Sequence, residues 1–195
     1  MEKPIYYSLE VSLNLIDKPN GEICKKVLED NKELFRIAKG SKTKHQAWQG
    51  GYLDHITETM NLARLFYDSL SSTGRPLNFS ISDSLLIMFL HDLEKPFKQV
   101  RGKQLGLEDR SGNKNNTQIK HFKEELIQKY GFQLNDSQLN ALRYVEGENE
   151  NYHPTERVMN ELASFCHMCD IWSARGWYDF PKIDNDPWKN LLKIL

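Results

Sequence analysis

The sequence predicts an all-α protein with a single domain. Apolar residues recur at helical spacing along most of the chain, and no series of alternating apolar and polar residues indicates a sheet. The length of 195 residues allows one domain with a substantial core, whereas two full domains would be cramped. The longest uninterrupted apolar run, LLIMFL at 85–90, is far shorter than the roughly 20 residues that cross a membrane.

The first half of the chain is expected to contain three helices. The first spans about 21–39 and is closed by Gly40, since glycine often ends a helix. The second spans about 52–70. The third spans about 82–92 and follows a serine-rich start that can cap its free backbone amides.

The second half is expected to contain three more helices. One spans about 117–130 and stops at Gly131. The next spans about 136–146, starting from an Asn-Asp pair that can cap it. The last spans about 154–174 and is opened by Pro154, because proline is tolerated in the first turn of a helix.

We expect residues 41–180 to form the main domain. Residues 1–40 are expected to be an N-terminal segment and helix packed on it, and 181–195 a C-terminal tail or helix. Residues 102–118 are loop-like through their Gly and Asn content. Between Lys95 and Lys120 basic residues exceed acidic ones by five, which suggests a flexible lid that gathers phosphate, although such a run is more often simply solvated.

The overall charge excludes some classes of partner. The chain has 26 Lys and Arg against 27 Asp and Glu, so its net charge does not attract long nucleic acid or an anionic membrane. The odd number of cysteines, Cys24, Cys166 and Cys169, argues against a disulfide framework. The amino terminus shows no signal-peptide pattern. We therefore expect reduced thiols and a cytoplasmic protein.

Polar residues on apolar helix faces are the first sign of a site. His55 precedes Leu62 by seven residues, which places it on the inward face of its helix. Asp170 follows Cys166 by four residues, again on an apolar stripe. Both side chains are expected to point into the interior.

The stretch MFLHDLEKPF at 88–97 brings His91 and Asp92 directly after a long apolar run. Burying such groups without partners costs several kcal/mol, roughly 2–7 for a neutral polar group. A divalent metal ion would satisfy them together with His55 and Asp170. Nitrogen and oxygen ligands without thiolates suit Mn, Fe, Co, Ni, Mg or Zn in an open site, where bound water favours hydrolysis.

These residues also carry a family resemblance. The order His55, His91-Asp92, Asp170 resembles the H…HD…D signature of the HD-domain superfamily of metal-dependent phosphohydrolases, in its compact bacterial and phage-type form. The flanking stretches HQAWQGGYLDH, HDLEKP and CDIWSAR are similar to those of the family. The resemblance implies an HD phosphohydrolase domain over 41–180, a helical bundle with a central metal site, and hydrolysis of phosphate esters or anhydrides.

Four more residues are candidates for contacting substrate. Lys95 lies three residues after Asp92, about one helical turn, so its ammonium could bind a phosphate oxygen or protonate a leaving oxygen. Arg175 would help neutralise the phosphate. Trp48 could stack on a base or merely cover the end of the bundle. The resemblance places His45 near the metal.

A second metal is a further possibility that the sequence leaves incomplete. Members of the family with two metals carry extra histidines, and His121 falls where the first is expected. The next expected position falls in EGENE at 146–150, which has no histidine, although Glu146 could serve as an oxygen ligand.

The function expected from the sequence is a metal-dependent phosphohydrolase that acts on a nucleotide or a related small phosphate ester. The alternatives are a 3′–5′ exonuclease of HD type and a catalytically inactive regulator that binds a nucleotide. The oligomeric state stays open.

Overall fold

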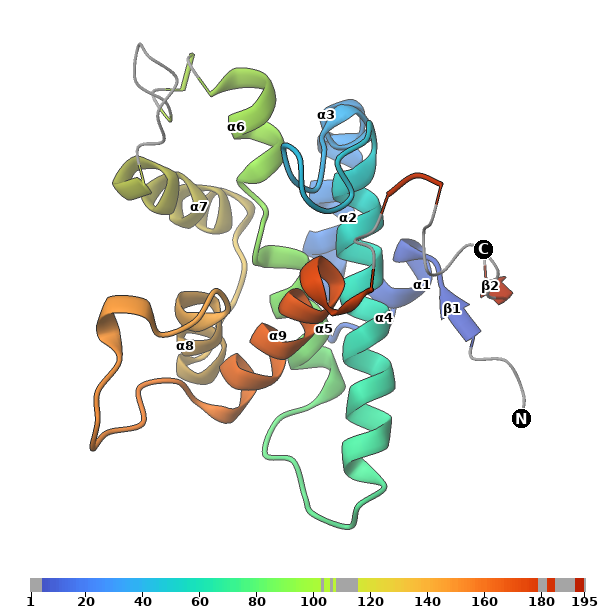
Figure 1. Cartoon of the computed structure of the whole chain (residues 1–195). Coiled ribbons are helices and arrows are strands. Elements are labelled where there is room, and N and C mark those ends of the chain that lie inside the picture. Colours follow the sequence, from blue (N-terminus) through green and yellow to red (C-terminus); the bar gives the residue numbers. More distant parts are fainter. Residues whose placement is uncertain are drawn as a thin grey trace.

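The structure is a computed structural model, shown in Figure 1. It describes residues 5–102, 104–105, 107, 116–178, 182–184 and 192–194. The chain is mainly helical, which confirms the predicted all-α class. Its helices are α1 (Leu9–Leu13), α2 (Asn20–Asp30), α3 (Lys32–Ile37), α4 (Gly51–Ser71), α5 (Ile81–Leu90), α6 (Lys95–Arg101), α7 (Asn116–Tyr130), α8 (Asp136–Tyr144) and α9 (Glu161–Ile171).

Two short strands, β1 (Ile5–Tyr7) and β2 (Leu192–Ile194), form a small parallel sheet that the sequence analysis did not predict. Ile5 pairs with Leu192 in this register. The pair lies beside α1 at the edge of the bundle, as Figure 1 shows. Most of the predicted loop at 102–118 and of the predicted tail at 181–195 lies outside the described residues.

The expected caps are present at two helices. The Ser80 side chain accepts a hydrogen bond from the Asp83 backbone amide, and the Asp83 carboxylate accepts one from the Ser80 backbone amide. Helix α5 therefore begins with a complete capping box. Asn135 and Gln138 form the same arrangement at the start of α8. These caps satisfy amides that would otherwise lack partners at the helix ends.

The single helix predicted over 21–39 is wrong, because the chain bends at Asn31 between α2 and α3. The side-chain amide of Asn31 donates to the Val27 carbonyl at 2.8 Å and to the Tyr130 hydroxyl at 2.9 Å. Asparagine competes for backbone groups in this way, which favours a break over a continuous helix.

The last predicted helix begins later than expected. Residues 154–160 are not helical, and α9 starts after Asn160, whose side chain accepts from the Ala163 amide at 2.8 Å. Asparagine caps a helix far better than an apolar residue does, so Asn160 fixes the start rather than Pro154. A short 3-10 turn, η1 (Asn149–Asn151), precedes it.

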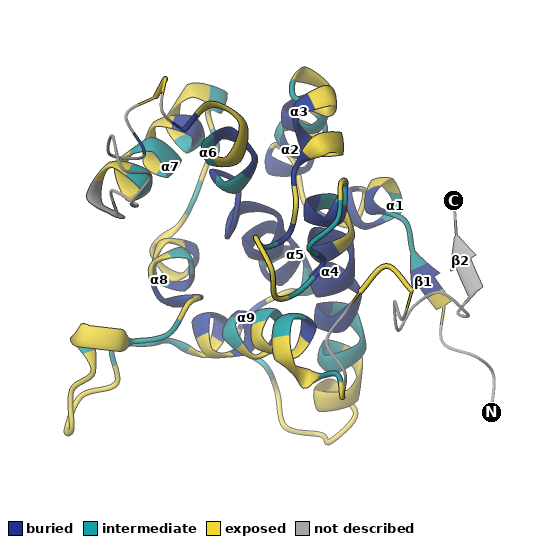
Figure 2. Cartoon of the chain, turned by 45° about the horizontal axis from the view of Figure 1, so that its top comes forward, coloured by how far each residue is buried: buried dark blue, intermediate teal, exposed yellow. Residues whose placement is uncertain are grey.

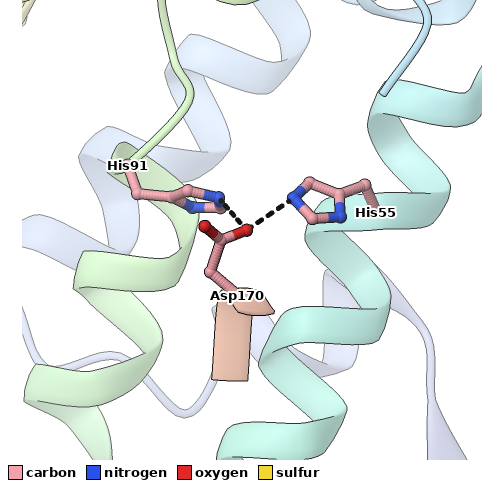
Figure 3. A group of neighbouring side chains, drawn as sticks. All are labelled: His55, His91 and Asp170. Carbon is pink, nitrogen blue, oxygen red and sulfur yellow. Dashed lines mark ion pairs between the residues drawn. The ribbon is translucent and has the colours of Figure 1, made fainter. Parts of the chain in front are cut away.

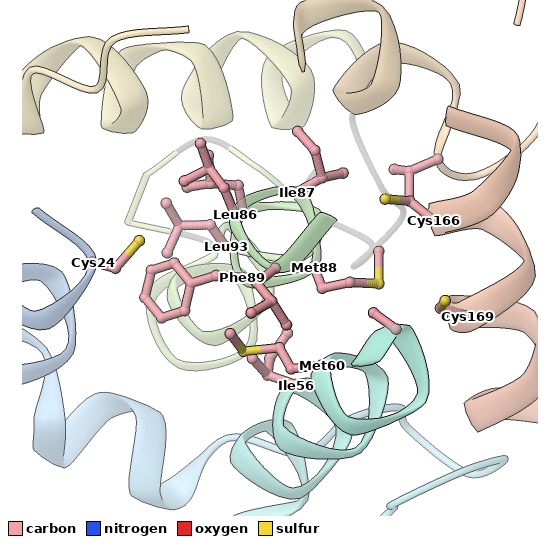
Figure 4. Packing of buried hydrophobic residues seen from close by; sticks show 14 of the residues in the cluster. Cys24, Ile56, Met60, Leu86, Ile87, Met88, Phe89, Leu93, Cys166 and Cys169 are labelled. Carbon is pink, nitrogen blue, oxygen red and sulfur yellow. The ribbon is translucent and has the colours of Figure 1, made fainter. Parts of the chain in front are cut away.

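Helix α5 forms the centre of the core. Its residues from Ser82 to Leu90 are buried except Asp83, and Figure 2 shows α4 and α5 as the darkest elements, surrounded by partly exposed helices. A helix that is apolar all round has to be enclosed in this way. Figure 4 shows Met88 and Phe89 at this centre, with the three cysteines around them as buried free thiols. In the described part of the chain, no helix has the length and apolarity needed to cross a membrane.

Candidate metal centre

Three helices converge on one group of polar side chains, of which Figure 3 draws His55, His91 and Asp170. His55 comes from the second turn of α4, and His91 and Asp92 follow directly on the end of α5. Asp170 comes from the last turn of α9. Both histidines are 0% exposed and Asp92 is 1% exposed, so the group lies in the interior.

The side-chain atoms of this group lie at the spacing of ligands around a single ion. Asp170 Oδ1 lies 3.2 Å from His55 Nε2 and 3.5 Å from His91 Nε2. Asp92 Oδ2 lies 3.5 Å and 3.2 Å from the same two nitrogens. Metal bonds of about 2.1 Å would separate neighbouring ligands by about 3.0–3.4 Å, in octahedral and tetrahedral geometry respectively.

The two Nε2 atoms are buried and have no hydrogen-bond partner among the described residues. The other ring nitrogen, Nδ1, has a partner in both residues. His55 Nδ1 contacts Ser173 Oγ at 3.0 Å, and His91 Nδ1 donates to the Met88 carbonyl at 2.7 Å. Leaving buried polar atoms unsatisfied is costly. A cation between the nitrogens and the carboxylates would remove that cost, so His55, His91 and Asp170 could hold a metal ion.

Asp92 has a second partner, since its Oδ2 forms a close ion pair with Lys95 Nζ. Burial opposes ionisation of Asp92, but Lys95 and His91 outweigh it and hold its pKa well below the usual value. Burial would lower the pKa of His91, yet Asp92 and Asp170 raise it to about 10. Both shifts have the same cause, because the carboxylates of Asp92 and Asp170 favour a positive charge placed between them.

A pocket of about 250 Å³ opens above these side chains. Asp92 and Asp170 line it, so the candidate metal centre is accessible to a small molecule. The other polar residues that line it are Lys44, His45, Lys95, Glu146, His167 and Arg175. Three cationic side chains, Lys44, Lys95 and Arg175, thus line the pocket beside three carboxylates, so groups that can bind an anionic ligand lie next to groups that can bind a cation.

The structure brings some of the predicted substrate contacts to this pocket and leaves others outside it. His45, Lys95 and Arg175 line it, as expected. Trp48 is not among its lining residues in the described chain; its indole Nε1 donates to Asp54 Oδ2 at 2.6 Å. Trp48 therefore covers the start of α4, the alternative role considered for it.

His121 and Glu146, the two residues considered for a possible second metal, are not brought together by the structure. Glu146 lines the pocket, but the His121 side chain is 65% exposed on α7 and contacts Glu125 at 3.3 Å. His121 and Glu125 are four residues apart and therefore meet on the exposed side of α7. His167, which the sequence analysis overlooked, lines the pocket instead, and its Nδ1 donates to the Val145 carbonyl at 2.6 Å.

Another overlooked contact holds α7 against the site. Lys123 Nζ lies 3.2 Å from Glu94 Oε2 and also donates to the His91 carbonyl. Burial raises the pKa of Glu94 although Lys123 opposes this. The pair ties α7 to the segment that carries His91 and Asp92.

A π-helical turn, η2 (Trp172–Gly176), follows directly on α9 and shapes the wall of the site. It buries Ser173 completely and brings Arg175 to the pocket. A Cβ on Gly176 would lie 2.6 Å from the Trp172 ring, so this close turn requires glycine. Turns of this type often occur at functional sites.

The loop before α4 packs closely enough to require glycine at position 51. A Cβ there would lie 1.9 Å from the Gln46 carbonyl oxygen. We expect Gly51→Ala to lower the free energy of unfolding by about 1–3 kcal/mol, because the backbone around Gln46 has to shift. Chemical denaturation measures this loss.

Gly74→Ala is the control for that measurement. Gly74 has a positive φ of 78° and open space around its Cβ position, so its substitution carries backbone strain of about 1 kcal/mol and no clash. Equal losses in the two variants would contradict the close approach at Gly51.

Comparisons with family models, with curated proteins and with solved structures find no match to this chain.

Proposed function

We propose that the chain is a metal-dependent phosphohydrolase, resembling the HD type, that cleaves a phosphate ester of a nucleotide or a related small molecule. The main support is the pair of buried Nε2 atoms of His55 and His91, which face two carboxylates that line a pocket together with Lys44, Lys95 and Arg175. Side chains of this kind, in this number, are typical of catalytic metals with open coordination positions.

The residues divide into two groups under this proposal. His55, His91 and Asp170 would hold a divalent metal, and Asp92 would join them when Lys95 turns toward substrate. The chemistry that such a metal supplies is polarisation of a phosphoryl oxygen and acidification of water.

The basic side chains act on the substrate. Lys44 and Arg175, which both line the pocket, would bind the phosphate oxygens. Lys95 would offset the charge that develops on the phosphate, and its ammonium has a proton to give to the leaving oxygen.

A hydrolysis screen tests the proposal. Mono-, tri- and cyclic nucleotides and short oligonucleotides are incubated with the protein and with Mn²⁺, Co²⁺, Ni²⁺, Mg²⁺ or Zn²⁺ in turn, and the products are separated by chromatography, because phosphodiesters yield nucleotides rather than inorganic phosphate. We expect metal-dependent hydrolysis of at least one small ester, and none after chelation. Tight nucleotide binding without hydrolysis under any metal would instead support the inactive regulator.

The size of the pocket and the near-neutral net charge of −1 predict how binding depends on substrate length. Affinity for single strands is expected to stay level from dinucleotides to twelve-mers, and to fall only modestly with salt, because few phosphates are contacted. Fluorescence anisotropy at several salt concentrations measures both. A steep rise with length and a large negative log–log salt slope would favour the exonuclease.

A further inference from the structure

A buried carboxylate lies behind the candidate metal centre and has no place in the proposed reaction. Glu58 is one helical turn after His55 on α4 and is 2% exposed. Its Oε2 accepts hydrogen bonds from Gln46 Nε2 at 2.5 Å and from Ser173 Oγ at 3.1 Å. Its Oε1 accepts from Trp177 Nε1 at 2.6 Å. Charge-assisted bonds of this kind are strong enough to compensate a buried carboxylate.

The hydrogen bond from Ser173 to Glu58 determines the direction of the hydrogen bond between Ser173 and His55. The single hydroxyl proton of Ser173 points at Glu58, so Ser173 Oγ has only lone pairs to offer His55 Nδ1, 3.0 Å away. The proton of the neutral His55 ring is thereby placed on Nδ1. Its Nε2 keeps a lone pair, and that lone pair faces Asp92 and Asp170.

Gln46 transmits the same constraint to a second histidine. Its amide nitrogen donates to Glu58, so the amide oxygen faces His45 Nδ1 at 2.7 Å and accepts the proton there. The His45 and His55 rings are neighbours, with centroids 4.9 Å apart, and His45 lines the pocket. Both rings are thus held by one carboxylate, each through one intermediate side chain.

We infer that Glu58 is a positioning residue, which through Ser173 and Gln46 fixes the Nδ1–H tautomers of His55 and His45 so that each ring keeps the lone pair on its Nε2. The use of those lone pairs for a metal and a substrate rests on the proposed function, whereas the tautomers do not. A histidine ligand commonly donates its other nitrogen to a carboxylate or similar group, and loss of such a partner typically weakens metal binding by 10–100-fold.

An amide at position 58 would disturb these hydrogen bonds, because Gln46, Ser173 and Trp177 all donate to the Glu58 carboxylate. In Glu58→Gln, the new amide nitrogen has to point at one of them. If it points at Ser173, that hydroxyl has to turn its proton toward His55, which places the ring proton on Nε2 and blocks the metal position.

Ser173→Ala is the principal test, with Ser84→Ala as the matched control. Both serines are 0% exposed, but the Ser84 hydroxyl donates to the Ser80 carbonyl of the preceding helical turn at 3.2 Å. Calorimetric titration of the metal-free protein with Zn²⁺ is expected to show a Kd about 10–100-fold higher in Ser173→Ala and unchanged in Ser84→Ala. Equal Zn²⁺ affinity in wild type and Ser173→Ala would overturn the inference.

The tautomers provide a readout that requires neither metal nor turnover. Long-range ¹H–¹⁵N spectra of the metal-free protein at alkaline pH are expected to show the His55 and His45 protons on Nδ1 in wild type. Glu58→Gln is expected to shift His55 toward Nε2–H, and a merely structural role for Glu58 would leave this ratio unmoved. An Nε2–H ring for His55 in wild type would also overturn the inference, while normal tautomers without Zn²⁺ binding would refute only the metal centre.

Discussion

Asp170→Asn is expected to abolish metal binding and hydrolysis together. Asp170 Oδ1 is within 3.5 Å of both buried histidine Nε2 atoms, so under the proposed function it would contribute both a ligand atom and the charge that holds a cation between them. The amide of the variant offers one neutral oxygen in its place. We expect bound metal to fall below detection after dialysis and kcat to fall by about 10³-fold or more, equivalent to roughly 4 kcal/mol of lost stabilisation.

The measurement pairs elemental analysis of the dialysed protein with the hydrolysis assay. Asp136→Asn is the matched control, because Asp136 lies exposed in the first turn of α8 and the same change of chemistry there leaves the pocket intact. Full metal occupancy with normal turnover in Asp170→Asn would exclude this aspartate from the centre and leave the proposed function without its main support.

Local sequence patterns predicted the residues that meet at the site because each obeys a short-range rule. His55 lies on the apolar face of its helix at heptad spacing, and Asp170 lies on the stripe that contains Cys166. Lys95 reaches Asp92 because three residues make about one turn. Such rules need no knowledge of the tertiary structure.

The supporting residues were missed because their role depends on contacts between distant segments. Glu58 looks like any polar residue on a long helix until Ser173, 115 residues later, is folded against it. A local signal did exist: Glu58 follows His55 by three residues, and Ser173 follows Asp170 by three, so each lies one turn from a predicted ligand. The π-helical turn that buries Ser173 and the pairing of β1 with β2 have no such signal, because both depend on packing of the whole chain.

The break between α2 and α3 could not be predicted from the sequence for a related reason. Helical periodicity continues through Asn31, and only its bonds to Val27 and Tyr130 favour the bend. Tyr130 is 99 residues away in the chain. Periodicity identifies which face of a segment is buried, but a side chain on a distant helix decides where the segment stops.

Lys95→Met is expected to separate metal binding from catalysis. In the metal-free protein the Lys95 ammonium occupies the carboxylate oxygen of Asp92 that also faces both histidine nitrogens, so lysine and metal compete for one atom. Removing the ammonium takes away the larger of the two positive charges, Lys95 and His91, that compensate the buried Asp92 carboxylate. We therefore expect the free energy of unfolding without metal to fall by about 3 kcal/mol, and added Mn²⁺ or Zn²⁺ to recover most of the loss.

The same variant is expected to bind metal as tightly as wild type or tighter, yet to hydrolyse substrate about 10²–10⁴-fold more slowly, because the proton donor and phosphate contact are gone. Thermal unfolding with and without metal, metal titration and the hydrolysis assay together test this. Lys120→Met, on the exposed face of α7, is the control that should change none of the three. If Lys95→Met instead loses metal affinity and keeps its turnover, then Lys95 supports the centre electrostatically, and the acid that protonates the leaving oxygen has to be sought in the two other histidines of the pocket lining, His45 and His167.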